Sequence, residues 1–214
     1  MPDGSVLKYG SQAKVTPVPP LILDRKNGMR MASRTAKEAF KSQNLLRTNP
    51  FTFESIIESQ INLFDADWKT IRDRFKGEVT TTTEGISAWQ EAFMALDAVP
   101  KMRALVWSDE LALAADDHCE DMGQNGMTGH TGSNGSTLKD RVARYGTSTG
   151  TVSENLIFGQ QASGQDYILS LYIDDGMVDR PHRKNLLSTS HTHTGIAHCQ
   201  HKTKGAMLVI VYAH

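Results

Sequence analysis

The sequence is poor in cysteine and has no long apolar run. Only two cysteines occur among its 214 residues. No apolar stretch approaches the roughly 18 residues that a transmembrane helix requires, and the beginning, MPDGSVLKYGSQAKVTPVPP, lacks the apolar core of a secretory signal. We therefore expect an intracellular, cytoplasmic protein without a membrane span.

The two cysteines, Cys119 and Cys199, leave two interpretations open. A reducing cytosol keeps thiols reduced, and free cysteines are among the most buried residue types. This redox argument favours two buried, reduced side chains. A disulfide between them is the alternative.

Acidic residues are scarce in the first 50 positions, which hold nine lysines and arginines against three acids, although the whole chain has a formal net charge of -1. The length suffices for one domain with an appendage. A basic arm on a mildly acidic body favours an acidic partner surface, and a solvated tail without a partner is the alternative. The basic residues expected to contact a partner are Lys8, Lys14, Arg25, Lys26, Arg30 and Arg34.

The segment TPVPPLIL at residues 16–23 combines three prolines with an apolar triplet. Proline removes backbone donors and fixes φ, so the segment is predicted to be extended. It cannot form a core by itself and is expected to lie in a groove. We predict that residues 1–40 are held by a partner within a larger assembly.

Apolar periodicity predicts helices over much of the chain. The clearest begins after Ser108, which can cap it, and runs to Met122, where Gly123 can supply the left-handed terminus. The other expected helices cover residues 30–44, 50–64, 67–75, 86–96, 138–145 and 166–173.

Strands are fewer. The β-branched residues of MLVIVYA indicate a hairpin of strands at 194–201 and 206–213, and a third strand is expected at 152–158. Helices that flank a small antiparallel sheet indicate the α+β class.

Five blocks of the sequence carry a family resemblance: LVWSDELALAADDHCEDM, GHTGSNGS, SENLIFG, HRKNLL and the final GIA...VIVYA hairpin. In order and spacing they resemble the CAP superfamily, whose SCP domain is shared by cysteine-rich secretory proteins, antigen 5 and pathogenesis-related 1 proteins. The resemblance covers residues 105–213. It implies a three-layer α-β-α sandwich at residues 43–214, with a helical insert around 65–100, preceded by an extended arm at 1–42.

The resemblance also implies a cleft with two histidines and two glutamates, which sometimes binds zinc or another divalent ion. Matched residue by residue, His130, Glu154 and His182 take three of the four places and are the candidate metal ligands. Where the family has Glu on a W-Y-x-E helix, this chain has LYID, so Asp174 is the nearest equivalent and Asp175 its competitor. A buried hydrogen-bonded network that fixes loops is the alternative to a metal site.

No residue of the sequence can be identified as a catalytic nucleophile. Ser133 and Ser136 are interpreted as turn and cap residues. His191 is predicted to lie in a surface loop, and Arg180 and Arg183 are predicted to pair with the aspartates beside them.

Two functions remain. The favoured one is a non-catalytic domain that serves as a structural or interaction component of an intracellular assembly, anchored by its basic arm. Because tubulin surfaces are strongly acidic, a cytoskeletal or ciliary, microtubule-associated role is the specific form of this prediction; nucleic acid is not expected as a partner. The alternative, which the family resemblance suggests, is a metal-dependent hydrolase or a lipid or sterol binder.

Overall fold

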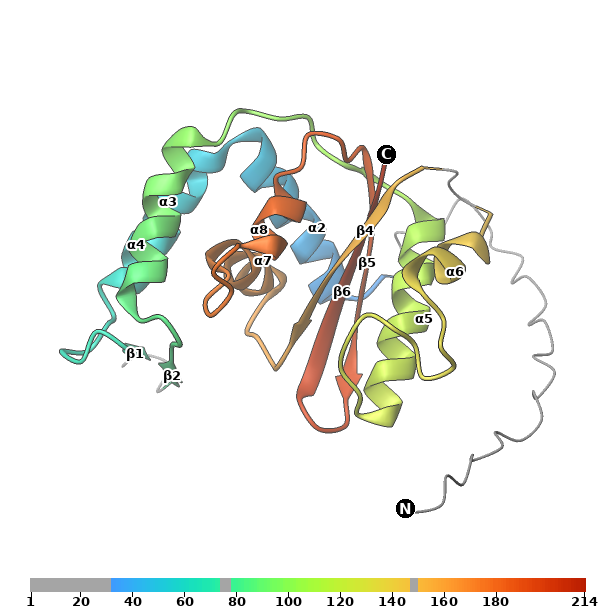
Figure 1. Ribbon diagram of the computed structural model, residues 1–214. Coiled ribbons are helices and arrows are strands. Elements are labelled where there is room, and N and C mark those ends of the chain that lie inside the picture. The colour runs from blue at the N-terminus through green and yellow to red at the C-terminus, as the bar shows by residue number, and fades with distance from the viewer. Residues whose placement is uncertain (1–31, 74–77, 147–149) are drawn as a thin grey trace, which may run out of the picture.

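The computed structural model describes residues 32–73, 78–146 and 150–214. A four-stranded sheet lies between two layers of helices, one on each face (Figure 1). The α-β-α sandwich predicted from the sequence is therefore confirmed. None of the described helices combines the length and the apolar character needed to cross a membrane. Five of the basic arm residues lie outside the described residues: Lys8, Lys14, Arg25, Lys26 and Arg30.

The central sheet has the strand order β3-β5-β6-β4. Strands β4 (Val152–Phe158) and β5 (His193–His201) pair antiparallel with β6 (Gly205–Ala213), one on each side, close to where the sequence predicts strands. The two-residue strand β3 (Val106–Trp107), which the sequence analysis misses, pairs parallel with the start of β5. The sheet is thus antiparallel except at this short edge.

Strand β6 supplies side chains to two separate cores. Successive side chains of a strand point to opposite faces. Val209 packs in a cluster beneath the helix that follows β3, and its neighbours Leu208 and Ile210 pack in the cluster beneath the opposite layer. All three are fully buried, so each helical layer is held to the sheet by its own apolar cluster.

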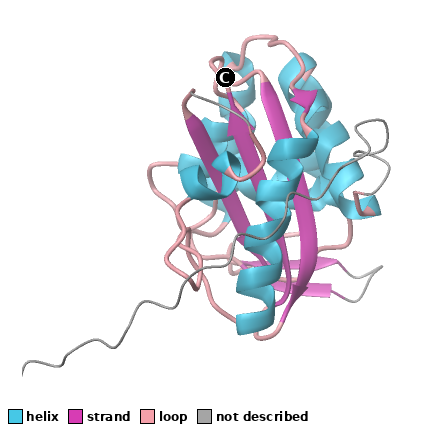
Figure 2. Cartoon of the chain, turned by 90° about the vertical axis from the view of Figure 1, so that its right-hand side faces the viewer, coloured by secondary structure: helices cyan, strands magenta, loops and turns pink. Residues whose placement is uncertain are grey.

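Helices α5 (Asp109–Asn125) and α6 (Leu138–Ala143) cover one face of the sheet, and α5 lies across it in Figure 2. The Ser108 hydroxyl accepts a hydrogen bond from an amide of the first turn of α5, as predicted. The end of the helix differs from the prediction. Gly126, with a φ of 65°, takes the left-handed conformation, and Gly123 remains helical.

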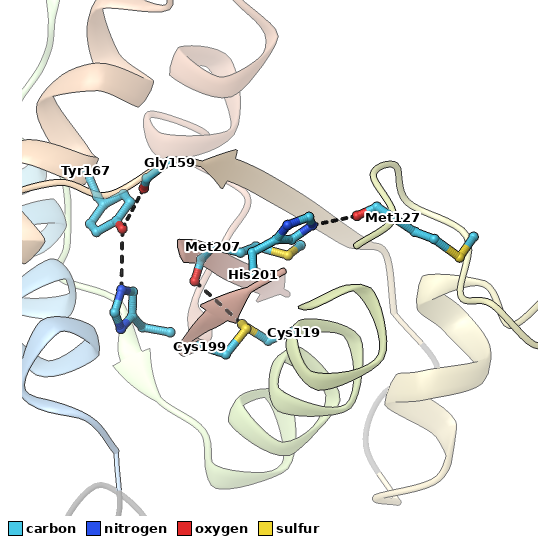
Figure 3. The surroundings of a disulfide bond; sticks show 8 residues. Cys119, Met127, Gly159, Tyr167, Cys199, His201 and Met207 are labelled. Atoms are coloured by element: carbon cyan, nitrogen blue, oxygen red, sulfur yellow. Dashed lines mark hydrogen bonds between the residues drawn. A yellow bond between two sulfur atoms is a disulfide. The ribbon is translucent and has the colours of Figure 1, made fainter. Parts of the chain in front are cut away.

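A disulfide joins α5 to β5 (Figure 3). It links Cys119 to Cys199 and corrects the prediction of two reduced thiols, although Cys119 is fully buried as expected. Helix and strand approach closely here: a Cβ at Gly123 would lie 2.3 Å from the carbonyl oxygen of Gln200. The cysteine-based support for an intracellular location is thereby removed.

Helices α2 (Arg34–Thr48), α7 (Gly164–Ile173) and α8 (Pro181–Leu186) cover the opposite face. Helix α2 crosses the boundary predicted at residue 42 and contributes buried alanines to the core from its first turns. Arg34, expected in the partner-binding arm, belongs to this helix, and its Nε donates to Glu38 at 2.7 Å.

An insert at residues 50–98 lies beside the layer formed by α2, α7 and α8 (Figure 1). Its strands form an antiparallel hairpin, which corrects the helix predicted for 67–75. The Asp67 carboxylate accepts hydrogen bonds from the amides of Lys69 and Thr70, both at 2.9 Å, and this local turn leads the chain into a strand instead of a helix. The elements of the insert are η1 (Pro50–Phe53), α3 (Glu54–Ile61), β1 (Thr70–Asp73), β2 (Glu78–Thr81), α4 (Ile86–Ala95) and η2 (Leu96–Ala98).

Candidate functional site

His130 and Glu154 form the first of two pairs among the predicted cleft residues. His130 Nδ1 lies 2.9 Å from Glu154 Oε1. The other carboxylate oxygen of Glu154 accepts a hydrogen bond from Arg141 Nη2 at 2.7 Å. The Glu154 and Arg141 side chains are 2% and 1% exposed, whereas that of His130 is 61% exposed. Glu154 is therefore a buried anion held by a buried cation.

Arg141 is the member of this cluster that the sequence analysis missed. Its guanidinium also donates to the carbonyl oxygens of His130 and Ser136, both at 3.2 Å, and thereby fixes the glycine-rich loop before α6. Nothing in the local sequence distinguishes it from a solvated helix residue, because its partner Glu154 is brought in by strand β4.

His118 completes this side of the site from helix α5. It is fully buried, and its Nε2 lies 2.9 Å from the Gly129 carbonyl oxygen and 3.9 Å from Glu154 Oε1. Burial lowers the pKa of His118 below its ordinary value. A neutral ring that donates from Nε2 therefore fixes the same loop.

Asp174 and His182 form the second pair, on the other helical layer. His182 Nδ1 lies 2.6 Å from Asp174 Oδ1, and Asp174 Oδ2 accepts the amide of His182 at 2.9 Å. Asp174 ends α7 in the left-handed conformation, with a φ of 58°, so its carboxylate faces the start of α8. Asp175, the competing candidate, instead accepts the amides of Thr83 and Glu84.

The two pairs do not merge into one ligand set. Two asparagines lie between them: Asn155 Nδ2 donates to the His182 carbonyl oxygen at 3.0 Å, and Asn185 Nδ2 donates to Asn155 Oδ1 at 2.8 Å. Within the described ranges, no group of three or more His, Cys, Asp or Glu side chains is placed to hold a metal ion. Arg141 beside Glu154 would also repel a cation, so His130, Glu154 and His182 do not fit a zinc site.

A cavity of about 370 Å³ opens beside the second pair. Its walls come from strand β4, helix α7 and strand β2 of the insert, and Asp174 and His182 lie at its polar end. The side chain of His182 is 23% exposed. Because Nδ1 faces the carboxylate, Nε2 is the ring nitrogen left for a ligand. The apolar side chains of the wall are Leu156, Ile157, Phe158, Leu171, Ile173 and Met177, with Trp89 from α4.

Two arginines attach the insert to the domain: Arg180, directly before α8, and Arg183, within α8. The prediction that Arg180 and Arg183 pair with neighbouring aspartates is wrong. Arg183 donates both terminal nitrogens to Glu91 of α4, at 2.6 and 2.8 Å, and Arg180 donates to Glu84 at 2.9 Å. The Arg183 guanidinium lowers the pKa of the Glu91 carboxyl. These ion pairs fix the insert, and with it one wall of the cavity, to the rest of the domain.

His191, predicted on a surface loop, is buried. Its ring stacks on Tyr212 with centroids 4.8 Å apart, Nδ1 donates to the Asn185 carbonyl oxygen at 3.1 Å, and Nε2 lies 3.0 Å from Ser153 Oγ. Burial lowers its pKa. The serines and threonines around His191 are typical of a loop, and only the fold brings its ring onto that of Tyr212.

Comparison with known proteins gives two distant structural likenesses and one family match. No curated protein matches the chain. An outer surface protein from Borrelia burgdorferi is 18% identical, with a TM-score of 0.45, over 60% of this chain and 89% of its own. An extracellular protein containing an SCP domain from Bacillus anthracis is 19% identical, with a TM-score of 0.46, over 64% of this chain and 47% of its own. These two likenesses carry no functional conclusion.

A match to a family model is more decisive. The model of the cysteine-rich secretory protein family, CAP, matches residues 99–212, which is more than half of the chain. The matched region contains the disulfide, His130, His182 and all of the central sheet except Ala213, the last residue of β6. The chain belongs to the CAP, or cysteine-rich secretory protein, family.

Proposed function

We propose that the chain is a non-catalytic CAP domain that serves as an interaction component of an intracellular assembly, with its basic arm bound to an acidic protein surface. The observation that carries the first half of this proposal is the state of the two cleft carboxylates. Both oxygens of Glu154 are occupied, one by Arg141 and one by His130. Both oxygens of Asp174 are occupied by His182.

Such carboxylates are poorly suited to general base catalysis. A base must accept a proton from a substrate or water, and these oxygens already accept hydrogen bonds from fixed donors. Ser133, close to His130 in sequence, is held away from a nucleophilic role, because it bonds through both its amide and its hydroxyl to Asp121. The two carboxylates therefore act as internal supports for the loops that they join, and His182 Nε2 is left for a ligand.

The second half of the proposal depends on charge. Nine basic residues against three acids in the first 50 positions give this end a local charge of about +6. Such a segment is attracted to a dense acidic surface, and a polymer of acidic subunits presents more negative charge to it than the mildly acidic remainder of the chain does. The microtubule surface is the acidic polymer we propose, in the cytoskeleton or a cilium.

Co-sedimentation with microtubules tests this proposal. We expect the full chain to pellet with microtubules at low salt and to be released as salt is raised. A variant with Lys8 and Lys14 changed to Gln should remain in the supernatant. The matched control changes Lys202 and Lys204, exposed on the β5–β6 turn, to Gln. Equal pelleting of the two variants would contradict a specific role for the arm.

The cavity beside His182 favours a second candidate, the binding of an amphipathic ligand such as a fatty acid. Its apolar wall could hold a chain, and His182 Nε2 could bind a polar head group. Met177→Glu would place a charge in this wall and should weaken binding of a fluorescent fatty acid about tenfold or more. Val178→Glu, at an 86% exposed neighbour, is the control. No binding by the unaltered protein would remove this candidate.

A further inference from the structure

Strand β5 has an edge that β3 covers only at its beginning. The pairing with β3 ends at Thr194, opposite Trp107, whereas β5 continues to His201. The Thr194 carbonyl accepts the amide of Ser108 on this edge. Because peptide groups of an antiparallel strand alternate between its two edges, those of Ile196 and His198 point the same way as that of Thr194.

These outward peptide groups have no partner within the described part of the chain. No hydrogen bond from a described residue reaches the amide or carbonyl of Ile196 or His198 on this side. Yet Ile196 is 2% exposed and its neighbour Ala197 is 5% exposed. Buried peptide groups are almost always hydrogen-bonded. This stretch of edge is therefore suited to receive another strand.

A cavity of about 270 Å³ lies at the same place, between the start of α2 and helix α5. Ile196, Ala197 and His198 form its floor, and Trp107, Ala112 and Leu113 contribute apolar walls. Two carboxylates, those of Asp109 and Asp116, also line it. The site thus combines open backbone groups, apolar walls and negative charge.

We propose that the apolar triplet Leu21-Ile22-Leu23 of the chain's own arm occupies this cavity as an added strand on β5. Ala32 and Ser33 line the cavity, so the arm leaves the described structure at its rim. Nine positions separate Leu23 from Ala32, and nine extended residues span up to about 30 Å, ample for a return to the edge.

The amino-acid composition of the arm also favours Leu21-Ile22-Leu23 as the segment that occupies the cavity. The three prolines before the triplet have no amide to donate, whereas Leu21, Ile22 and Leu23 keep theirs and carry apolar side chains. Arg25 and Lys26 follow directly, and their charge complements that of Asp109 and Asp116. The groove that the extended segment requires is then on the same chain. Docking there leaves Lys8 and Lys14 ahead of it for another partner.

Amide hydrogen exchange resolved by residue tests this proposal. In the full chain we expect the amides of Ile196 and His198 to be protected. Deletion of residues 1–28 should speed their exchange about tenfold or more, and a synthetic peptide of residues 15–28 added in trans should restore protection. The amide of Ala197, which faces β6, is the internal control and should not change.

A substitution pair separates the triplet from the charge of the arm. Changing all three residues of the triplet to Ser should reproduce the deletion, and Lys8→Ser with Lys14→Ser should not. Fast exchange at Ile196 and His198 in the full chain, or protection that survives the deletion, would overturn the proposal. So would protection that appears only as the protein dimerises, since the strand would then come from a second copy. Neither result depends on microtubule binding.

Discussion

Reduction of the Cys119–Cys199 disulfide should lower the free energy of unfolding by several kcal/mol. The bond closes a loop between residues 80 apart in sequence, which makes it a long-range constraint. In the chain-entropy account, a loop of about 80 residues removes roughly 15 cal/mol/K from the unfolded ensemble, or about 4.5 kcal/mol at room temperature. Residual structure in the unfolded chain reduces this, so we expect about 3 to 4 kcal/mol.

Urea unfolding followed by circular dichroism measures this difference directly. The oxidised protein and the same protein in dithiothreitol have the same atoms in the core, so the comparison creates no cavity. A loss of about 4 kcal/mol should lower the melting temperature by about 10 °C for a chain of this size. The double variant Cys119→Ala with Cys199→Ala is the control, and reductant should leave its unfolding curve unchanged.

Superimposable curves for the oxidised and reduced protein would refute this reasoning. Two free thiols in the purified protein, counted by mass spectrometry after alkylation without reductant, would refute the bond itself. The result also bears on location, because the cytosol reduces most structural disulfides. An intracellular chain would have to fold stably with α5 held to β5 by packing alone.

Three further changes are predicted to alter stability. Glu154→Gln leaves Arg141 buried without its counter-charge and should cost about 3 kcal/mol in urea unfolding, whereas Glu38→Gln, in an exposed pair with Arg34, should change stability far less. Burial lowers the folded-state pKa of His118, so the unfolded chain binds the extra proton and stability should fall as the pH drops below about 6.5; His118→Asn should flatten this slope. Arg183→Lys loses the bidentate ion pair with Glu91 of α4 and should lower the free energy of unfolding by about 1 to 3 kcal/mol, measured by thermal unfolding.

The sheet and the helices around it could be predicted because their patterns are local. The run MLVIVYA identifies β6, and the apolar stripe after Ser108 identifies α5. Strand β3 could not be found, since two residues have no periodicity and owe their pairing to the start of β5. Strand β1 could not be found either, because the turn that leads into it depends on Asp67, which is equally compatible with a helix.

The candidate site was predictable in its residues and not in its pairing. Motif matching named His130, Glu154, Asp174 and His182, and the structure places them as two pairs. The partner that decides the character of Glu154 is Arg141, which no pattern singles out. The disulfide could not be predicted for a different reason. The expected cellular compartment favours reduced thiols, but the contact between α5 and β5 decides whether the two cysteines meet.

The incomplete cover of β5 has a consequence for how the protein must be handled. A row of unpaired peptide groups beside apolar side chains is a template on which other chains can pair, and such edges promote aggregation. Natural sheets protect such edges with charge, with proline or with a covering segment. A chain shortened to begin at Ala32 would keep the edge and lose the arm of residues 1–31. Such a fragment should form β-rich aggregates more readily than the full protein at equal concentration.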